Sequence, residues 1–197
     1  MANLIRLAER VFLILLSLSV IARLAPAFAT HPQVAIFLAS ELVAVVLLLI
    51  QRRGEWTVEP RPVLIAFIGT GVALLVVPEG ATIASNAVSS TLILTGGAIA
   101  LAAKLSIGRS FGVVPANRGV KRGGTYRLIR HPMYAGYILN HLGFLLLYLS
   151  WWNVAVYVVA WAFLWLRIGE EEKFLRRDPD YVEYAAAVPY RLIPGIA

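Results

Sequence analysis

Hydrophobic residues gather in six long runs that alternate with short polar stretches along the whole chain. Most runs approach the ~20 residues that a helix needs to cross a hydrocarbon core of about 30 Å. The predicted spans are Leu4–Leu24, Val34–Ile50, Val63–Val77, Val88–Ser106, Met133–Leu149 and Trp152–Ile168. A transmembrane barrel is excluded, because its strands would alternate over segments of about 10 residues. The pattern predicts an all-α integral membrane protein with about six transmembrane helices.

Positive charge is distributed very unevenly between the two sides of these spans. The N-terminus, the 51–61 and 104–130 loops and the C-terminal tail hold 17 of the 18 Lys and Arg residues, and the other side holds only Arg23. By the positive-inside rule, the side rich in Lys and Arg faces the cytoplasm. We therefore expect a multi-pass protein of a bacterial-type inner membrane, with both termini and the long 104–130 loop in the cytoplasm.

Composition agrees with a membrane protein and narrows the chemistry. The chain is 59% hydrophobic and only 15% charged, against about 25% charged in soluble proteins. The net charge of +7 follows from the topology, so no nucleic-acid partner is expected. Cysteine is absent, which excludes a disulfide scaffold, a cysteine nucleophile and thiolate metal sites.

The first run has an alternative interpretation as a signal peptide. Arg6 and Arg10 precede an apolar segment, and the small residues of 25–29 follow it. Arg23 interrupts that pattern, so we expect a retained helix. The chain then forms a single membrane domain, residues 1–197, in which 1–107 is a scaffold and 108–197 carries the chemistry.

The densest group of polar and aromatic residues precedes the fifth span, between Gly123 and Tyr134. Pro132 suits the first turn of a helix, where a missing N–H costs nothing. The free N–H groups and the positive dipole end of that helix would then bind an anion, such as a cofactor carboxylate. Alternatively, Arg130 is a positive-inside anchor, and Tyr126 and Tyr134 are interface aromatics.

A second group follows the sixth span. If the helix continues, Arg167, Glu171 and Leu175 share one face. Glu172 then pairs with Arg176 at the surface, whereas Glu171 requires a specific partner near the membrane boundary. Alternatively, these glutamates form a solvated helix end. A short amphipathic helix over 180–184, capped by Asp180, follows as a lid or an interfacial anchor.

Together these segments resemble the isoprenylcysteine carboxyl methyltransferase family, and the phospholipid N-methyltransferases share a related pattern. The shared order is Gly-x-Tyr-x-x-x-Arg-His-Pro-x-Tyr (124–134), a hydrophobic hairpin, Glu-Glu-x-x-Leu (171–175) and Tyr-x-x-Tyr (181–184). The resemblance covers about residues 118–194.

The resemblance implies a cytoplasm-facing site for S-adenosylmethionine, without a metal and without a Rossmann fold. The implied cofactor-binding residues are Arg118, Gly119, Val120, Lys121, Tyr126, His131, Pro132, Met133, Tyr134 and Glu171. Arg167, together with Glu171, is implied in catalysis, and Arg167 is implied in binding the methyl acceptor.

Several functions remain open at this point. A lipophilic acceptor drawn from the bilayer is expected, and a carboxylate fits Arg167 best, because a guanidinium holds a carboxylate at two points. A lipid amine is the alternative acceptor. An NADPH-dependent enzyme similar to sterol reductases and a non-catalytic membrane protein are further alternatives.

Three polar residues stand at membrane depth, namely Glu41, Asn140 and His141. Such groups rarely face lipid; they pair with each other or line a cavity. We expect a hydrogen bond between Glu41 and His141, with an acceptor-binding cavity as the alternative.

Overall fold

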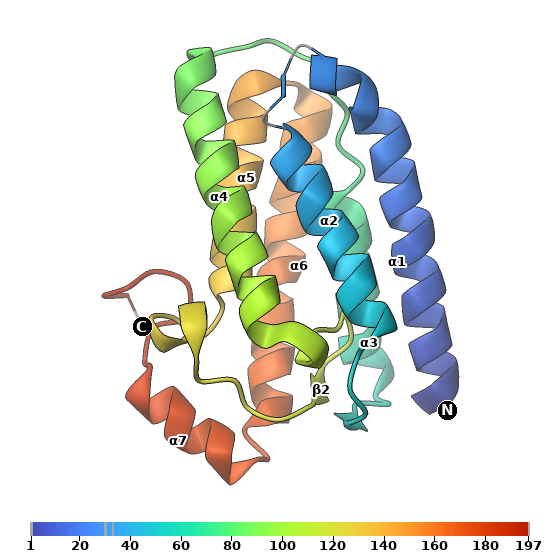
Figure 1. The fold of residues 1–197 in the computed structure, drawn as a ribbon, viewed down its shortest axis with the longest axis vertical. Helices are drawn as coiled ribbons and strands as arrows, with labels where there is room; N and C mark the ends of the chain where they lie inside the picture. Colours follow the sequence, from blue (N-terminus) through green and yellow to red (C-terminus); the bar gives the residue numbers. More distant parts are fainter. Residues whose placement is uncertain (1, 30, 33, 197) are drawn as a thin grey trace.

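Six long helices run side by side and form an elongated bundle, and a seventh, short helix crosses one end of it (Figure 1). This computed structural model describes residues 2–29, 31–32 and 34–196. The elements are α1 (Ala2–Leu24), η1 (Ala25–Ala29), α2 (Val34–Leu49), β1 (Glu55–Trp56), α3 (Pro60–Ala73), α4 (Asn86–Ile107), η2 (Gly108–Ser110), β2 (Ala116–Asn117), η3 (Gly124–Arg127), α5 (Pro132–Leu147), α6 (Trp151–Leu175) and α7 (Pro179–Ala187).

The helices α1 to α6 coincide with the six predicted apolar runs, so the mostly helical fold class is confirmed. The largest differences are at two helix ends: α3 ends at Ala73, before Val77, and α6 continues past Ile168 to Leu175. The all-α prediction also missed a small ribbon, in which β1 pairs antiparallel with β2.

Among the residues that the structure describes, two helices are long and apolar enough to cross a membrane. They are α4 with its η2 extension, Asn86–Ser110, and α6, Trp151–Leu175. Shorter apolar helices occupy Leu38–Leu49 and Pro60–Ala73.

Helices α4 and α5 approach each other closely through small residues. A Cβ atom added at Gly136 would lie 2.6 Å from both the backbone N of Ala100 and the carbonyl O of Gly96. Glycine is therefore required at this crossing, because any side chain would displace one backbone from the other. This contact fixes the start of α5 relative to the end of α4.

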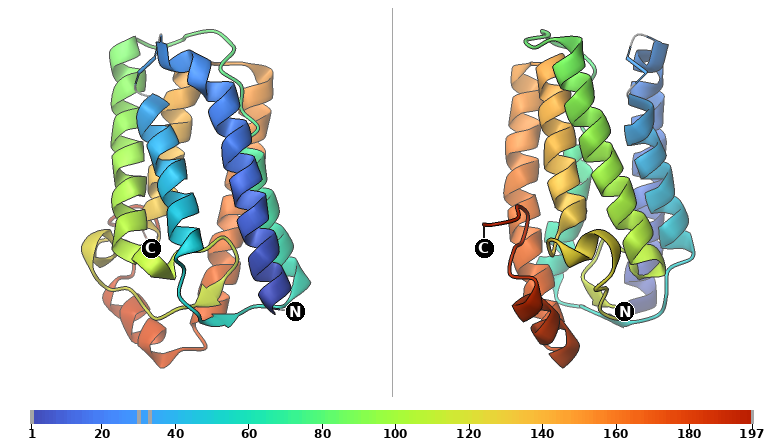
Figure 2. Two further views of the ribbon diagram at one scale, coloured as in Figure 1. Left: turned by 45° about the vertical axis from the view of Figure 1, so that its right-hand side comes forward. Right: turned by 60° about the vertical axis from the view of Figure 1, so that its left-hand side comes forward.

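The loops that follow α2, α4 and α6 all lie at one end of the bundle, the end at which α1 begins (Figures 1 and 2). Residues 108–131, β1 and α7 are gathered there. The predicted gathering of the long loop and the tail at one end is thus observed.

Charged side chains also occur inside the bundle. Lys104, expected in a loop, lies in α4 and is fully buried. Its Nζ donates to the carbonyl O of Ser40 at 2.8 Å and pairs with Oε1 of Glu41 at 3.3 Å. The expected hydrogen bond between Glu41 and His141 is therefore wrong: Glu41 pairs with Lys104, and His141 accepts from Trp161.

Candidate active site

A cavity opens at the loop-rich end, between the 107–121 segment, the start of α5, the end of α6 and α7. Nearly all the residues predicted to bind a cofactor or acceptor line it. These are Arg118, Gly119, Val120, Lys121, Tyr126, His131, Met133, Tyr134, Arg167 and Glu171. Pro132 is the exception: it is buried at the start of α5 and does not line the cavity.

A tight turn places Tyr126 at this cavity. Gly124 adopts a φ of +60°, and a Cβ there would lie 2.3 Å from Oγ of Ser106. Only glycine meets both conditions, so it lets η3 pack against α4. The buried Tyr126 is held by Tyr184, whose hydroxyl donates to its carbonyl O at 2.8 Å.

The start of α5 carries His131 and Tyr134. His131 precedes the helix, and Pro132 occupies the first turn, as predicted. The rings of His131 and Tyr134 stack with centroids 5.5 Å apart. The Tyr134 hydroxyl donates to Oε2 of Glu171 at 2.7 Å, so Glu171 has the specific partner that the sequence required.

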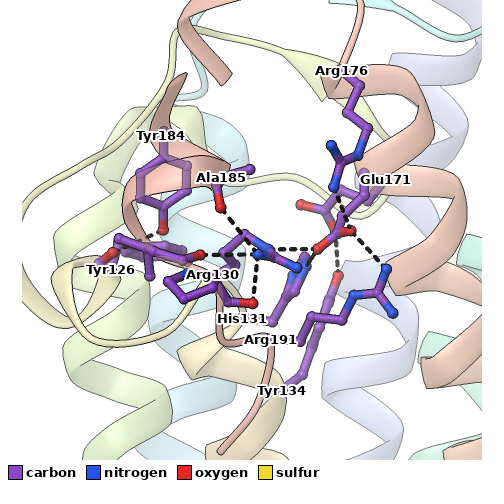
Figure 3. A network of polar contacts seen from close by, with 12 residues as sticks. Tyr126, Arg130, His131, Tyr134, Glu171, Arg176, Tyr184, Ala185 and Arg191 are labelled. Atoms are coloured by element: carbon purple, nitrogen blue, oxygen red, sulfur yellow. Dashed lines mark hydrogen bonds and ion pairs between the residues drawn. The ribbon is translucent and has the colours of Figure 1, made fainter. Parts of the chain in front are cut away.

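Glu172 differs most from its prediction as a surface residue. Its side chain is only 3% exposed and lies in a network of cationic groups (Figure 3). Its Oε1 accepts from Nε of Arg130 at 2.8 Å and lies 3.1 Å from Nε2 of His131. Its Oε2 accepts from Arg191 at 3.1 Å, whereas Arg176 is 3.7 Å away. Glu172 thus orients Arg130 and His131, which line the cavity.

The guanidinium of Arg167 holds the far wall of the cavity. It donates to Oγ1 of Thr70 at 3.0 Å and to the carbonyl O of Val113 at 2.7 Å. Its centre lies 5.4 Å from the centroid of Tyr134. Its Nε atom is buried and has no partner among the residues described.

Two further polar groups at the cavity lack partners. Nε and Nη2 of Arg118 and the hydroxyl of Tyr181 are buried without a hydrogen bond to any described residue. Burial lowers the pKa of Arg118 to about 10, so its guanidinium is charged at neutral pH. A buried, unpaired cation strongly favours an anionic ligand.

The C-terminal segment covers one side of the cavity. Nη1 of Arg130 donates to the carbonyl O atoms of Val188 and Pro189, at 2.9 and 2.8 Å. The cap of α7 is Asp178, whose side chain accepts from the N–H of Asp180; the prediction that Asp180 is the cap was wrong.

A second cavity lies deeper in the bundle, among α1, α2, α3, α5 and α6. Glu41 and His141 line it, together with mostly apolar side chains. Five residues line both cavities and form the wall between them: Phe111, Val113, Met133, Tyr134 and Arg167. The tyrosine and the arginine are the polar groups of this wall.

The sequence also gave no indication of a role for Glu9. This α1 residue is fully buried, and its Oε1 accepts from the backbone N–H groups of Val113 and Val114. An acidic residue within an apolar run is the signal that could have identified it. In the part of the chain that the structure describes, no group of three His, Cys, Asp or Glu residues could hold a metal ion.

Comparisons with known proteins identify methyltransferases that this chain resembles. Residues 84–178 match the family model described as phospholipid methyltransferase. The chain is 36% identical over 105 residues to protein-S-isoprenylcysteine O-methyltransferase A of Arabidopsis thaliana, over 49% of this chain and 53% of the relative. The resemblance to the isoprenylcysteine carboxyl methyltransferase family is confirmed.

A second relative, protein-S-isoprenylcysteine O-methyltransferase B of Arabidopsis thaliana, is 32% identical over 107 residues, covering 50% of this chain and 54% of the relative. The chain thus spans about half the length of the curated relatives it matches. No solved structure matches the chain.

Proposed function

We propose that the protein is an integral-membrane, S-adenosylmethionine-dependent methyltransferase that methylates a lipophilic carboxylate. The observation that carries this proposal is the wall shared by the two cavities, where Tyr134 and Arg167 stand between a cavity lined by several charged side chains and a more apolar one. A water-soluble cofactor and a lipophilic acceptor would meet at such a wall. The similarity to two methyltransferases gives independent support.

The polar cavity suits the cofactor. Arg118 has free, buried N–H groups for its carboxylate, and the unpartnered Tyr181 hydroxyl is a further hydrogen-bonding group. Glu171 would accept from its hydroxyls or amine, and Tyr126 and Tyr134 would pack against its rings and sulfonium. When bound, S-adenosylmethionine would supply a methyl group activated by its sulfonium.

At the other side of the wall, Arg167 would orient the acceptor. The free Nε of Arg167 is one hydrogen-bond donor for a carboxylate oxygen. A carboxylate is already ionised at neutral pH, so this chain has to align it and exclude water rather than remove a proton. The cofactor would be contacted on its own side of the wall by His131, Met133 and the remaining cavity residues.

The bundle would lie in a membrane with α1 to α6 as spans and the cavity at the cytoplasmic surface. The long apolar helices α4 and α6 support this arrangement. Large apolar side chains such as Leu94, Leu105, Val158 and Trp165 point outward from these two helices, where lipid would cover them.

A lipid amine is the second candidate acceptor, favoured by the description of the matching family model. An amine would need its proton removed before transfer. The guanidinium of Arg167 at the wall favours an anion instead. Methyl transfer to fatty carboxylates and to phosphatidylethanolamine, assayed side by side in detergent, separates the two.

Calorimetry on detergent-purified protein tests the cofactor. We expect S-adenosylmethionine to bind in the micromolar range with or without a chelator, and NADPH not to bind. Arg118→Gln should weaken binding about tenfold or more, since a hydrogen bond to a charged group contributes about 1.5–3 kcal/mol. The control is Arg122→Gln, because Arg122 pairs with Glu183 at the exposed surface. Binding of NADPH, or equal affinity in both variants, would contradict the proposal.

A further inference from the structure

The second, deeper cavity, called the inner cavity from here on, is lined by His141. One ring nitrogen of His141 has a hydrogen-bond partner, and the nature of that partner shows that the other nitrogen is an unused donor. Nδ1 of His141 lies 3.1 Å from Nε1 of Trp161. An indole N–H only donates, so Nδ1 of His141 must be the acceptor. The proton of the imidazole is therefore on Nε2. Among the described residues, the only hydrogen bond of this imidazole is the one to Trp161, and His141 lines the cavity.

The ring of His141 is held rigidly by its neighbours. It stacks on Tyr157 at 4.3 Å between centroids and on Tyr137 at 6.3 Å. Stacking and the Trp161 hydrogen bond together fix the orientation of the imidazole. A donor fixed in a mostly apolar cavity is costly unless a ligand satisfies it.

An acceptor group lines the same cavity. Glu41 contributes its carboxylate there, while Lys104 holds one carboxylate oxygen. Lys104 itself is occupied by the carbonyl O and Oγ of Ser40 and by Glu41. The cavity thus offers a donor from α5 and an acceptor from α2, which a purely hydrocarbon tail would leave unused.

The distance between His141 and the wall shared by the two cavities indicates where along an acceptor His141 would make contact. His141 follows Tyr134 by seven residues on α5, which corresponds to about 10 Å along a helix. A molecule whose reacting group lies at Tyr134 and Arg167 would bring its tail past His141 at about that distance.

We infer that the acceptor carries a hydroxyl group on its tail, about 10 Å from the atom that is methylated, and that His141 recognises it. A hydroxyl accepts from Nε2 of His141 and has a proton of its own to donate, which suits the nearby carboxylate of Glu41. The inference rests on the proposed function, because it assumes that the reacting group of the acceptor lies at Tyr134 and Arg167 and its tail extends toward His141. It concerns selection among acceptors, which the cofactor cavity does not determine.

Binding without cofactor tests this inference separately from methyl transfer. The probes are dodecanoic acid and isomeric hydroxydodecanoic acids, titrated by calorimetry into detergent-purified protein. The isomer with its hydroxyl about 10 Å from the carboxylate should bind about fivefold or more tighter than the plain acid, as one additional hydrogen bond predicts. Isomers with the hydroxyl elsewhere should show less preference.

Three variants assign the preference to His141. His141→Phe keeps an aromatic ring between the two tyrosines, so it should bind the plain acid normally and lose the preference. Trp161→Phe removes the N–H group that makes Nδ1 of His141 the acceptor, so the imidazole proton can move between the two nitrogens. This variant should have a reduced preference although it retains His141. Asn140→Ala is the control, because Asn140 donates to the carbonyl O of Ile93 on α4 and should leave the preference unchanged.

Equal binding of all acids by the parent protein, or a preference that survives His141→Phe, overturns the inference. If neither acid binds, it is also overturned. Methylation of the plain and hydroxylated acids at equal rates would leave the proposed function standing and remove only this inference. Failure to bind S-adenosylmethionine would remove the proposed function, while the comparison of acids would still report on His141.

Discussion

Nε2 of His131 lies 3.1 Å from Oε1 of Glu172, where the end of α6 passes the start of α5. The same oxygen accepts from Nε of Arg130, so one carboxylate orients two consecutive residues of the family motif. Glu172 itself does not line the cavity, whereas His131 does. Glu172 is therefore a positioning residue, and its neighbour Glu171 is the one that lines the cavity.

Replacement of Glu172 should destabilise the protein. Glu172→Gln leaves Arg130 and Arg191 without their anionic partner, and loss of one member of a buried ion pair costs about 3 kcal/mol. We expect a clearly lower midpoint of thermal unfolding in detergent. Arg176→Gln is the control, because that arginine is half exposed and 3.7 Å away, and it should cost less than about 1 kcal/mol. A Glu172→Gln protein as stable as the parent would refute this positioning role.

Glu171→Gln should have the opposite profile. It removes the charged acceptor of the Tyr134 hydroxyl at the cavity. The affinity for S-adenosylmethionine should therefore fall about tenfold. The thermal midpoint should stay close to that of the parent, because Glu171 is not part of the buried cationic network. Glu170→Gln, which loses only a pair with the exposed Arg61, should change neither quantity. Calorimetry and thermal unfolding on the three glutamine variants would distinguish these outcomes.

Arg167→Lys distinguishes orientation of an acceptor from simple anchoring. A lysine ammonium cannot keep the bonds of the guanidinium to Thr70 and Val113 and also present a donor at the position of Nε. The variant should therefore retain cofactor affinity and lose most of its turnover with a carboxylate acceptor. Arg177→Lys, at an exposed pair with Glu59, serves as the control. Turnover within about twofold of the parent would eliminate the proposed role of Arg167.

The α4–α5 crossing should be sensitive to one added methyl group. Gly136→Ala places a Cβ 2.6 Å from backbone atoms of α4 and should destabilise the protein by about 1–3 kcal/mol. Gly169→Ala is a matched control in α6, since a Cβ there meets no atom within 4 Å. It should be neutral or stabilising by up to about 1 kcal/mol. Thermal unfolding of both variants tests the difference, and equal midpoints would contradict it.

The sequence predicted the helices well, because the apolar runs and the Pro132 signal are local features. The three separate motif segments meet at one cavity, because α5 runs away from that end of the bundle and α6 returns to it. The burial of Glu172, Lys104 and Glu9 could not be predicted in the same way. Each of these charges is stabilised by partners far away in sequence, so only the packed bundle shows which helix face is covered.

The same limit explains why the burial of Glu172 was not predicted. Spacing along α6 pairs Glu172 with Arg176, and that contact does exist. Arg130 and Arg191 approach the same carboxylate more closely from other segments. Local spacing identified a partner but not the strongest ones.

The C-terminal segment is tied to the site through its main chain. The N–H groups of Arg130 and His131 donate to the carbonyl O atoms of Tyr190 and Arg191, at 2.8 and 2.9 Å. Carbonyl groups are common to all residue types, so most substitutions at these two acceptor positions would preserve both bonds. An insertion or deletion between α7 and Tyr190 would shift the pairing by whole residues. Among homologous proteins, the length of this connection should therefore vary less than its residues do.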